Sequence, residues 1–322
     1  MADGNDDDEH DDGGRLVVTV VVALVVGLVT VRFLRMVSAD LLRSPALARR
    51  NYRDRMVPTA GGIYLVLTVL VVEAGRAVLG ALGVGEETGL TQARSEVLFA
   101  VVGFAFLGLV DDLAATGSDR GFRGHLGALR TGRVTTGLLK LGGGAAIAIV
   151  LVATPGFKDG RGLLVDAMLI ALAANFFNLL DRAPGRVIKF GLLAYLPLAL
   201  VLGVAPIGVA IAPVIGAAVG LFGDDLRERL MLGDTGANVI GAVLGLGVVL
   251  GASEGWRLAI MLVLLGLNVA AELVSFSRII EAVPPLRAFD RLGRVRVPRG
   301  RSRQGGPRQG GPRQGGSHPG RA

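Results

Sequence analysis

The chain has 322 residues, of which 51% are hydrophobic, and its mean hydropathy is +0.57. It is too apolar for a soluble domain with a hydrated surface, and it has no cysteine for a disulfide framework or a cysteine-based metal site. The net charge is +7, but the arginines stand in short loops between apolar blocks and in the tail, so we expect no nucleic-acid partner.

Two charged tails flank the apolar part of the chain. Residues 1–14, MADGNDDDEHDDGG, are acidic without apolar periodicity, which predicts a disordered tail. They do not resemble a cleaved secretory signal, so we expect the next block to remain as a membrane helix. Residues 15–283 are then the membrane domain. Residues 284–322 form a basic tail, low in complexity from about residue 299, that we expect to lie on anionic headgroups.

The membrane domain reads as an all-α, polytopic helical bundle. Apolar stretches of about the length that a bilayer requires recur along it. They cover residues 16–34, 58–80, 97–115, 134–154, 163–180, 187–204, 206–222, 235–253 and 257–282. The pattern predicts about nine transmembrane helices.

Basic residues set the expected orientation. Positive loops stay on the cytoplasmic side of a membrane. Every second loop, at residues 35–57, 116–133 and 181–189, is rich in basic residues. These residues are Arg35, Arg43, Arg49, Arg50, Arg53, Arg55, Arg120, Arg123, Arg130, Arg133, Arg182, Arg186 and Lys189. We therefore expect a multi-pass protein of the inner (plasma) membrane, with the N-terminus outside and the C-terminus cytoplasmic.

Four polar clusters fall at predicted cytoplasmic ends of spans. They are PTAGG (58–62), Asp111-Asp112, residues 175–186 and GDTG (233–236). Clusters far apart in sequence but on one membrane face predict a single site there. A transporter would more naturally place its polar residues at the midplane, on interrupted helices.

The carboxylates point to a cation. Asp111 and Asp112 end one span, Asp181 ends another and Asp234 begins a third. Mg²⁺ prefers hard oxygen ligands and is commonly held by one or two carboxylates together with substrate phosphates, and Mn²⁺ is an alternative. The competing interpretation is that each aspartate only caps or terminates its helix at the polar interface.

Glycines and amides surround these acids. GDTGAN (233–238) opens a span, so a phosphate could approach its backbone N–H groups beside Gly236. NFFNLLD (175–181) places Asn175, Asn178 and Asp181 three residues apart on one helix face. The alternatives are that small residues such as Gly241 and Gly245 pack helices, and that buried asparagines join neighbouring helices.

A basic segment could bind a diphosphate. GFRGHLGALRTGRVTTGLLK (121–140) contains His125, several arginines and Lys140. The same segment could equally be an amphipathic helix that rests on anionic lipid.

Taken together, these motifs resemble the polyprenyl-phosphate N-acetylhexosamine-1-phosphate transferase family (glycosyltransferase family 4). The similarity is carried by PTAGG, GLVDDL (108–113), NFFNLLD and MLGDTGANVIG (231–241), in the family's order. The resemblance covers about residues 58–245. It implies a Mg²⁺-dependent transfer of a sugar-1-phosphate from a UDP-sugar to polyprenyl (undecaprenyl) phosphate, with release of UMP, in cell-envelope glycan synthesis.

The resemblance also assigns roles to residues. Asp111, Asp112 and Asp234 match the catalytic aspartates, with Asp234 and Asp112 as the expected metal ligands. Asn178 and Asp181 match the family's Asn-x-x-Asp element near the nucleotide. From the residue patterns above, we also expect Asn175, Arg186, His125, Lys140 and Gly236 to bind substrate. One of the paired aspartates would take a proton from the lipid phosphate. A homodimer is possible.

Three departures mark the chain as a divergent member. Pro184 stands where the family has a second aspartate, Ala115 stands where the peptidoglycan enzymes have a lysine, and residues 284–294 lack their histidine cluster. We therefore do not expect the peptidoglycan precursor as substrate, and arginines would hold the phosphates instead.

Two other classes of function stay open at this point. The departures could mean lost chemistry, in which case the protein binds polyprenyl phosphate or scaffolds envelope assembly without releasing UMP. A transporter, with the cytoplasmic acids as a gate, is the less favoured alternative. Neither requires the set Asp111, Asp112 and Asp234.

Overall fold

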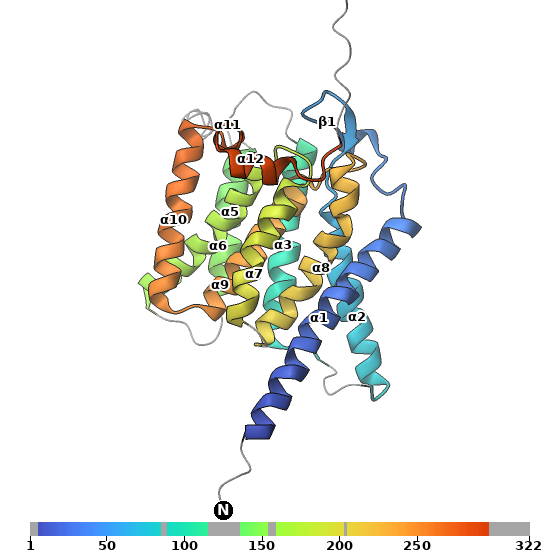
Figure 1. Ribbon diagram of the computed structural model, residues 1–322, viewed down its shortest axis with the longest axis vertical. Helices are drawn as coiled ribbons and strands as arrows, with labels where there is room; N and C mark the ends of the chain where they lie inside the picture. The colour runs from blue at the N-terminus through green and yellow to red at the C-terminus, as the bar shows by residue number, and fades with distance from the viewer. Residues whose placement is uncertain (1–5, 85–88, 115–135, 154–158, 203–204, 296–322) are drawn as a thin grey trace, which may run out of the picture.

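The structure is a computed structural model that describes residues 6–84, 89–114, 136–153, 159–202 and 205–295. This part of the chain forms a bundle of long helices that run up and down between two ends (Figure 1). They are α1 (Asp6–Val37), α2 (Ile63–Ala81), α3 (Gln92–Ala114), α5 (Thr136–Val152), α6 (Gly160–Leu180), α7 (Arg186–Leu202), α8 (Pro206–Leu226), α9 (Gly233–Gly251) and α10 (Glu254–Leu273).

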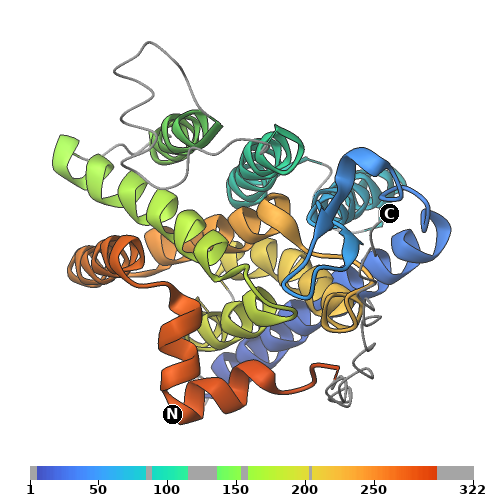
Figure 2. The same cartoon turned by 90° about the horizontal axis from the view of Figure 1, so that it is seen from above.

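Short elements gather at one end of the bundle, the upper end in Figure 1. They are the 3₁₀ helix η1 (Pro45–Leu47), strands β1 (Ala48–Arg50) and β2 (Met56–Pro58), and helices α11 (Phe276–Ala282) and α12 (Pro284–Arg291). The two strands pair antiparallel, with Arg49 opposite Val57. Figure 2 looks down on this end, with the β1–β2 hairpin on one side and α11 and α12 on the other.

Helices α8 and α9 form the centre of the bundle, and the other helices surround them (Figure 2). Small residues let the backbones approach closely, as is common between membrane helices. Gly241 and Gly245 of α9 lie against Ala173 and Ile170 of α6, so the packing interpretation of these two glycines holds. Gly216 of α8 lies in the same way against the backbone of α1.

The prediction of an all-α polytopic membrane bundle is confirmed. Eight of the nine predicted stretches each overlap one long helix, and the ninth is divided between α10 and α11. Within the described residues, seven helices are long and apolar enough to cross a membrane: α2, α3, α6, α8, α9, α10 and the Val18–Val37 part of α1. Helices α5 and α7 have 17 residues each and are shorter. The orientation stays a prediction.

Several element boundaries differ from the sequence prediction. The last stretch, 257–282, is not one helix: α10 ends at Leu273, the chain is extended at Val274 and Ser275, and α11 follows. The second helix begins at Ile63 and not near Pro58, because Pro58 ends strand β2. At the other end of the chain, α1 continues back into the acidic segment as far as Asp6.

Candidate functional site

The polar clusters predicted to share a membrane face lie together at the upper end of the bundle. The segment before α2 pairs with the segment before α9 through their backbones. Met231 N–H donates to the Pro58 carbonyl at 2.7 Å, Gly61 N–H to the Met231 carbonyl at 3.0 Å and Gly62 N–H to the Leu232 carbonyl at 2.9 Å. The PTAGG segment is therefore hydrogen-bonded through its backbone to the segment that leads into α9.

Glycines allow the segments before α2 and α9 to approach this closely. Gly233 has φ +71°, a left-handed conformation that favours glycine, and a Cβ there would lie 2.6 Å from Thr59 Oγ1 and 2.7 Å from Asp112 Oδ2. Gly236 packs against the backbone of Gly62 and is not among the residues that line the neighbouring cavity. The geometry thus gives Gly236 a packing role.

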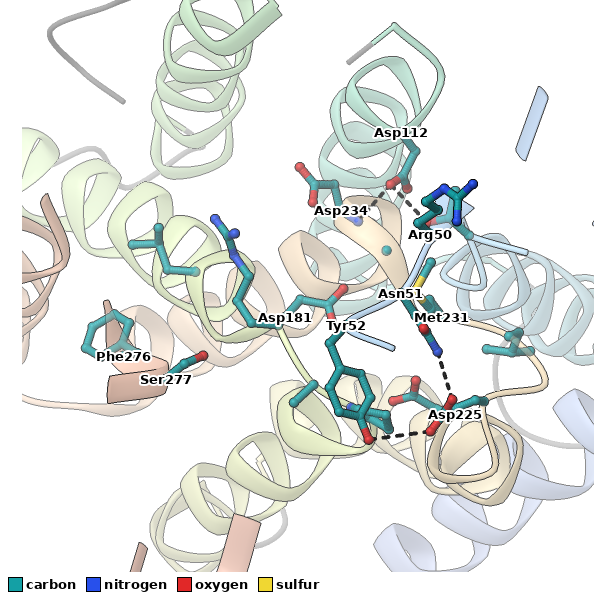
Figure 3. A pocket seen from close by; sticks show the side chains of 18 of the residues that line it. Arg50, Asn51, Tyr52, Asp112, Asp181, Asp225, Met231, Asp234, Phe276 and Ser277 are labelled. Atoms are coloured by element: carbon teal, nitrogen blue, oxygen red, sulfur yellow. Dashed lines mark hydrogen bonds between the residues drawn. The ribbon is translucent and has the colours of Figure 1, made fainter. Parts of the chain in front are cut away.

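Asp112 binds the first turn of α9 (Figure 3). Its Oδ1 accepts hydrogen bonds from Asp234 N–H (3.2 Å) and Thr59 Oγ1 (3.2 Å), and its Oδ2 accepts from Thr235 N–H (3.0 Å) and Thr235 Oγ1 (2.6 Å). A carboxylate at a helix N-terminus satisfies free N–H groups and suits the helix dipole. Asp112 therefore fixes α9 to the end of α3.

Asp111 and Asp234 share one cation, the ammonium group of Lys140 from α5. The Lys140 Nζ atom lies 2.5 Å from Asp234 Oδ2 and 3.5 Å from Asp111 Oδ2. With its carboxamide oriented to match its neighbours, Asn178 donates to Asp234 Oδ1 at 2.6 Å and accepts from Lys140 Nζ at 2.6 Å. Oxygen atoms from α3, α6 and α9 thus converge on one positive charge.

This cluster borders a cavity of about 610 Å³. The acidic residues that line the cavity are Asp112, Asp181, Asp225, Glu228 and Asp234, and the basic ones are Arg50 and Arg182. Figure 3 shows Asp112, Asp181, Asp225 and Asp234 around it. The excess of acids predicts that a ligand of this cavity brings positive charge with it.

Asp181 lies just beyond the end of α6 and has the clearest electrostatic perturbation. Burial raises the pKa of Asp181 well above its ordinary value, and the negative charges of Asp225, Asp234 and Asp112 raise it further. A hydrogen bond from Gly233 N–H acts in the opposite direction. Together with the Asp112 contacts, this bond engages the first N–H groups of α9, so they are not free to receive a phosphate.

The donor set suits a divalent cation by its chemistry. The carboxylates of Asp111 and Asp234 and the amide oxygen of Asn178 are hard oxygen ligands of the kind that Mg²⁺ takes. Among the described residues, no group of three or more histidine, cysteine, aspartate or glutamate side chains is arranged to hold a metal ion. The prediction paired Asp112 with Asp234 as metal ligands, whereas the carboxylate that shares a cation with Asp234 is Asp111.

The remaining predicted residues have separate environments. Arg186 is 4% exposed and forms a bidentate ion pair with Asp290 at 2.8 and 3.0 Å. Asn175 donates to Asn268 of α10 at 2.7 Å, as the alternative of an interhelical hydrogen bond predicted. His125 lies outside the described residues.

Sequence reasoning missed the acids at the end of α8. Asp225 lines the cavity and accepts a hydrogen bond from Gly185 N–H at 2.9 Å. Glu228 accepts from Asn51 Nδ2 at 2.8 Å and from the Tyr52 hydroxyl at 3.5 Å. A signal was available, because Asp224-Asp225 ends an apolar stretch just as Asp111-Asp112 does.

Comparison with known proteins gives relatives of one name. No family model matches the chain. A phospho-N-acetylmuramoyl-pentapeptide-transferase of Desulforamulus reducens is 29% identical over 271 residues, 79% of this chain and 79% of the relative. The protein of that name from Deinococcus radiodurans is 31% identical over 212 residues (63% and 64%), and the one from Borreliella burgdorferi is 24% identical over 263 residues (72% and 72%).

Proposed function

The chain is a divergent member of the polyprenyl-phosphate N-acetylhexosamine-1-phosphate transferase family, and from this premise we propose that it transfers a sugar-1-phosphate from a UDP-sugar to polyprenyl phosphate. UMP is the leaving product, and the reaction belongs to cell-envelope glycan synthesis. The relatives are phosphosugar transferases by name, which supports the reaction class. The sugar is a separate question, because the three sequence departures set this chain apart from the peptidoglycan enzymes.

One observation carries the proposal. Four motifs that are far apart in sequence meet at one end of a membrane bundle, beside an acid-lined cavity of about 610 Å³. At its edge, the oxygen atoms of Asp111, Asp234 and Asn178 surround the ammonium group of Lys140, and Asp234 is the one of the three acceptors that lines the cavity. A cation-bound diphosphate fits such a cavity, because it supplies the positive charge that the acids lack.

The residues divide the work. We assign Asp111, Asp234 and the amide oxygen of Asn178 to the cation, which would be Mg²⁺ with Mn²⁺ as a substitute and would take the place that the Lys140 ammonium group holds in this structure. When bound, this ion neutralises diphosphate charge and makes the phosphorus easier to attack. Asp112 is a positioning residue in this assignment, because its two oxygen atoms hold the start of α9. Asp181 lies in the same cavity, where the nucleotide part of the donor is expected.

Positioning is the main contribution of the protein in phosphoryl transfer. The hydrogen-bonded junction of α3 and α9 positions Asp111 and Asp234 beside one another for the approach of the acceptor phosphate to the donor. Of the paired aspartates, Asp111 is the one we place beside the reacting phosphates, because Asp112 already accepts four hydrogen bonds.

The test is UMP release by the purified protein in detergent with undecaprenyl phosphate, Mg²⁺ and a panel of UDP-sugars. We expect release that requires both the lipid and the metal, and that ends when Asp234 is replaced by Asn. The variant should unfold at nearly the wild-type temperature, because the amide keeps the shape of the carboxylate. Asp159→Asn, at the opposite end of α6, is the matched control.

Two results would count against the proposal. Full activity of Asp234→Asn would remove the site assignment. Wild-type protein that is folded and binds the lipid, but releases no UMP with any donor, would favour the non-catalytic alternative.

A further inference from the structure

A second cavity, of about 890 Å³, adjoins the first. The two share four lining residues, Tyr52, Arg182, Ala183 and Ser277. The arginines that line the second cavity are Arg53, Arg182, Arg186, Arg291 and Arg294, and the acids are Glu281 and Asp290. We call it the arginine cavity. Its charge is opposite to that of the first cavity, where five acids face two arginines.

The wall of the arginine cavity is held in place by buried charged groups. Arg186 of α7 binds Asp290 of α12 through two nitrogen atoms, and its third nitrogen donates to Ser277 Oγ at 2.9 Å. Lys189 Nζ donates to the carbonyl groups of Asp290 at 2.7 Å and Leu292 at 2.6 Å, at the end of α12. The cavity is therefore built before any ligand arrives, which lowers the cost of binding.

Unused positive charge remains in this wall. The side chain of Arg182 is exposed and has no hydrogen-bond or ion-pair partner in the described part of the chain, and it stands where the two cavities join. Arg53 is 3.0 Å from Glu228, and Arg291 pairs with Glu281 at the surface. Even with Glu228 counted, arginines outnumber acids.

We propose that the arginine cavity binds an anionic group, a carboxylate or a phosphate, on the glycosyl part of the donor. This rests on the proposed function, which places the donor diphosphate in the first cavity. A ligand that passes from one cavity to the other leaves the acids near Asp234, crosses Arg182 and ends among arginines. Arginine forms strong charge-assisted hydrogen bonds with both carboxylates and phosphates. The donor is thus an acidic nucleotide-sugar.

The test compares pairs of donors that differ by one carboxylate. Binding is titrated calorimetrically with the whole protein in phosphatidylcholine nanodiscs with Mg²⁺, using UDP-glucose against UDP-glucuronic acid and UDP-N-acetylglucosamine against UDP-N-acetylmuramic acid. In at least one pair we expect the acidic donor to bind about tenfold more tightly. R182Q and R291Q should remove this preference. R278Q on α11, which removes an exposed arginine outside both cavities, should keep it.

Each outcome decides between the possibilities. Equal binding within both pairs overturns the proposal, while UMP release from the neutral donors would leave the transferase function standing. If no UDP-sugar binds, the proposed function fails. The effect of inorganic phosphate on the unfolding temperature then tests whether the arginine cavity binds anions. If phosphate raises the unfolding temperature of the wild type but not that of R182Q, the cavity is an anion site. Equal shifts in the two unfolding temperatures overturn the anion site. A preference that disappears in discs with phosphatidylglycerol assigns the cavity to a lipid headgroup and also overturns the donor assignment.

Discussion

Asp111 and Asp112 are neighbours in the chain but have different surroundings. Asp112 accepts four hydrogen bonds from Thr59, Asp234 and Thr235, and it is part of the helix junction. Asp111 lies beside the ammonium group of Lys140. At the scale of single residues, Asp112 therefore has a structural role at the junction of α3 and α9, and Asp111 belongs to the charged cluster around Lys140.

This difference predicts two kinds of variant. Asp112→Ala should destabilise the fold by about 1–3 kcal/mol, because it leaves the N–H groups at the start of α9 without an acceptor. Asp111→Ala should lose UMP release while its unfolding midpoint changes little. Denaturation in detergent, followed by circular dichroism, measures both. Equal destabilisation by the two substitutions would show that the structural roles are not separate.

The perturbed Asp181 predicts a dependence of stability on pH. Because burial and nearby acids raise the pKa of Asp181, the folded state binds this proton more tightly than the unfolded state does. The wild type therefore loses stability as pH rises above about 4, until the pH exceeds the raised pKa. Asp181→Asn has no such loss, so its unfolding temperature should gain on the wild type over this range. A constant difference at all pH values would contradict the assignment.

At the scale of elements, short structures at the upper end hold the long helices in register. The segment 58–62 is hydrogen-bonded to residues 231–232, and α12 is fastened to α7 through Asp290. Burial would raise the pKa of Asp290, but hydrogen bonding to Arg186 and the charges of Arg186 and Arg294 outweigh it and lower the pKa. The buried ion pair thus stays charged at neutral pH.

Breaking that pair should release α12. Asp290→Asn leaves Arg186 and Arg294 with one neutral partner, and loss of a buried charge partner costs about 3–5 kcal/mol. Because the chain has no cysteine, a single cysteine at Leu286 can report on α12 by its labelling rate. We expect faster labelling in Asp290→Asn. Glu281→Gln, which breaks the exposed pair with Arg291, is the control and should change little. Equal rates in both variants would mean that the ion pair does not hold the helix.

At the scale of the whole molecule, the length of the apolar stretches and the placement of the basic loops were sufficient to predict a polytopic helical bundle and the meeting of four motifs. The roles within the site were not predictable in the same way. Lys140 is far from Asp111 in the chain, and only the packing of α5 beside α3 brings the two side chains together. Likewise, Asp290 is far from Arg186 in sequence, so the sequence could not show that this arginine is already paired.

Because the chain has no cysteine, single introduced cysteines can also test the orientation of the molecule in the membrane. Ser44 lies in the upper connection after α1, and Ser253 lies in the lower connection between α9 and α10 (Figure 1). A cysteine at Ser253 should react with an impermeant maleimide in intact cells, and one at Ser44 only after the membrane is opened. The reverse pattern would place the candidate site outside the cell.

The acid-lined cavity lies at the ends of membrane helices, and its lining includes residues of the β1–β2 hairpin and of α11. For the proposed reaction, its two substrates then arrive from different phases. The nucleotide-sugar comes from water and is counted in molarity, whereas the prenyl phosphate diffuses within the leaflet and is counted per lipid. Added neutral lipid dilutes the second substrate without changing the first, so a cell could set the flux through this protein by the composition of its membrane alone.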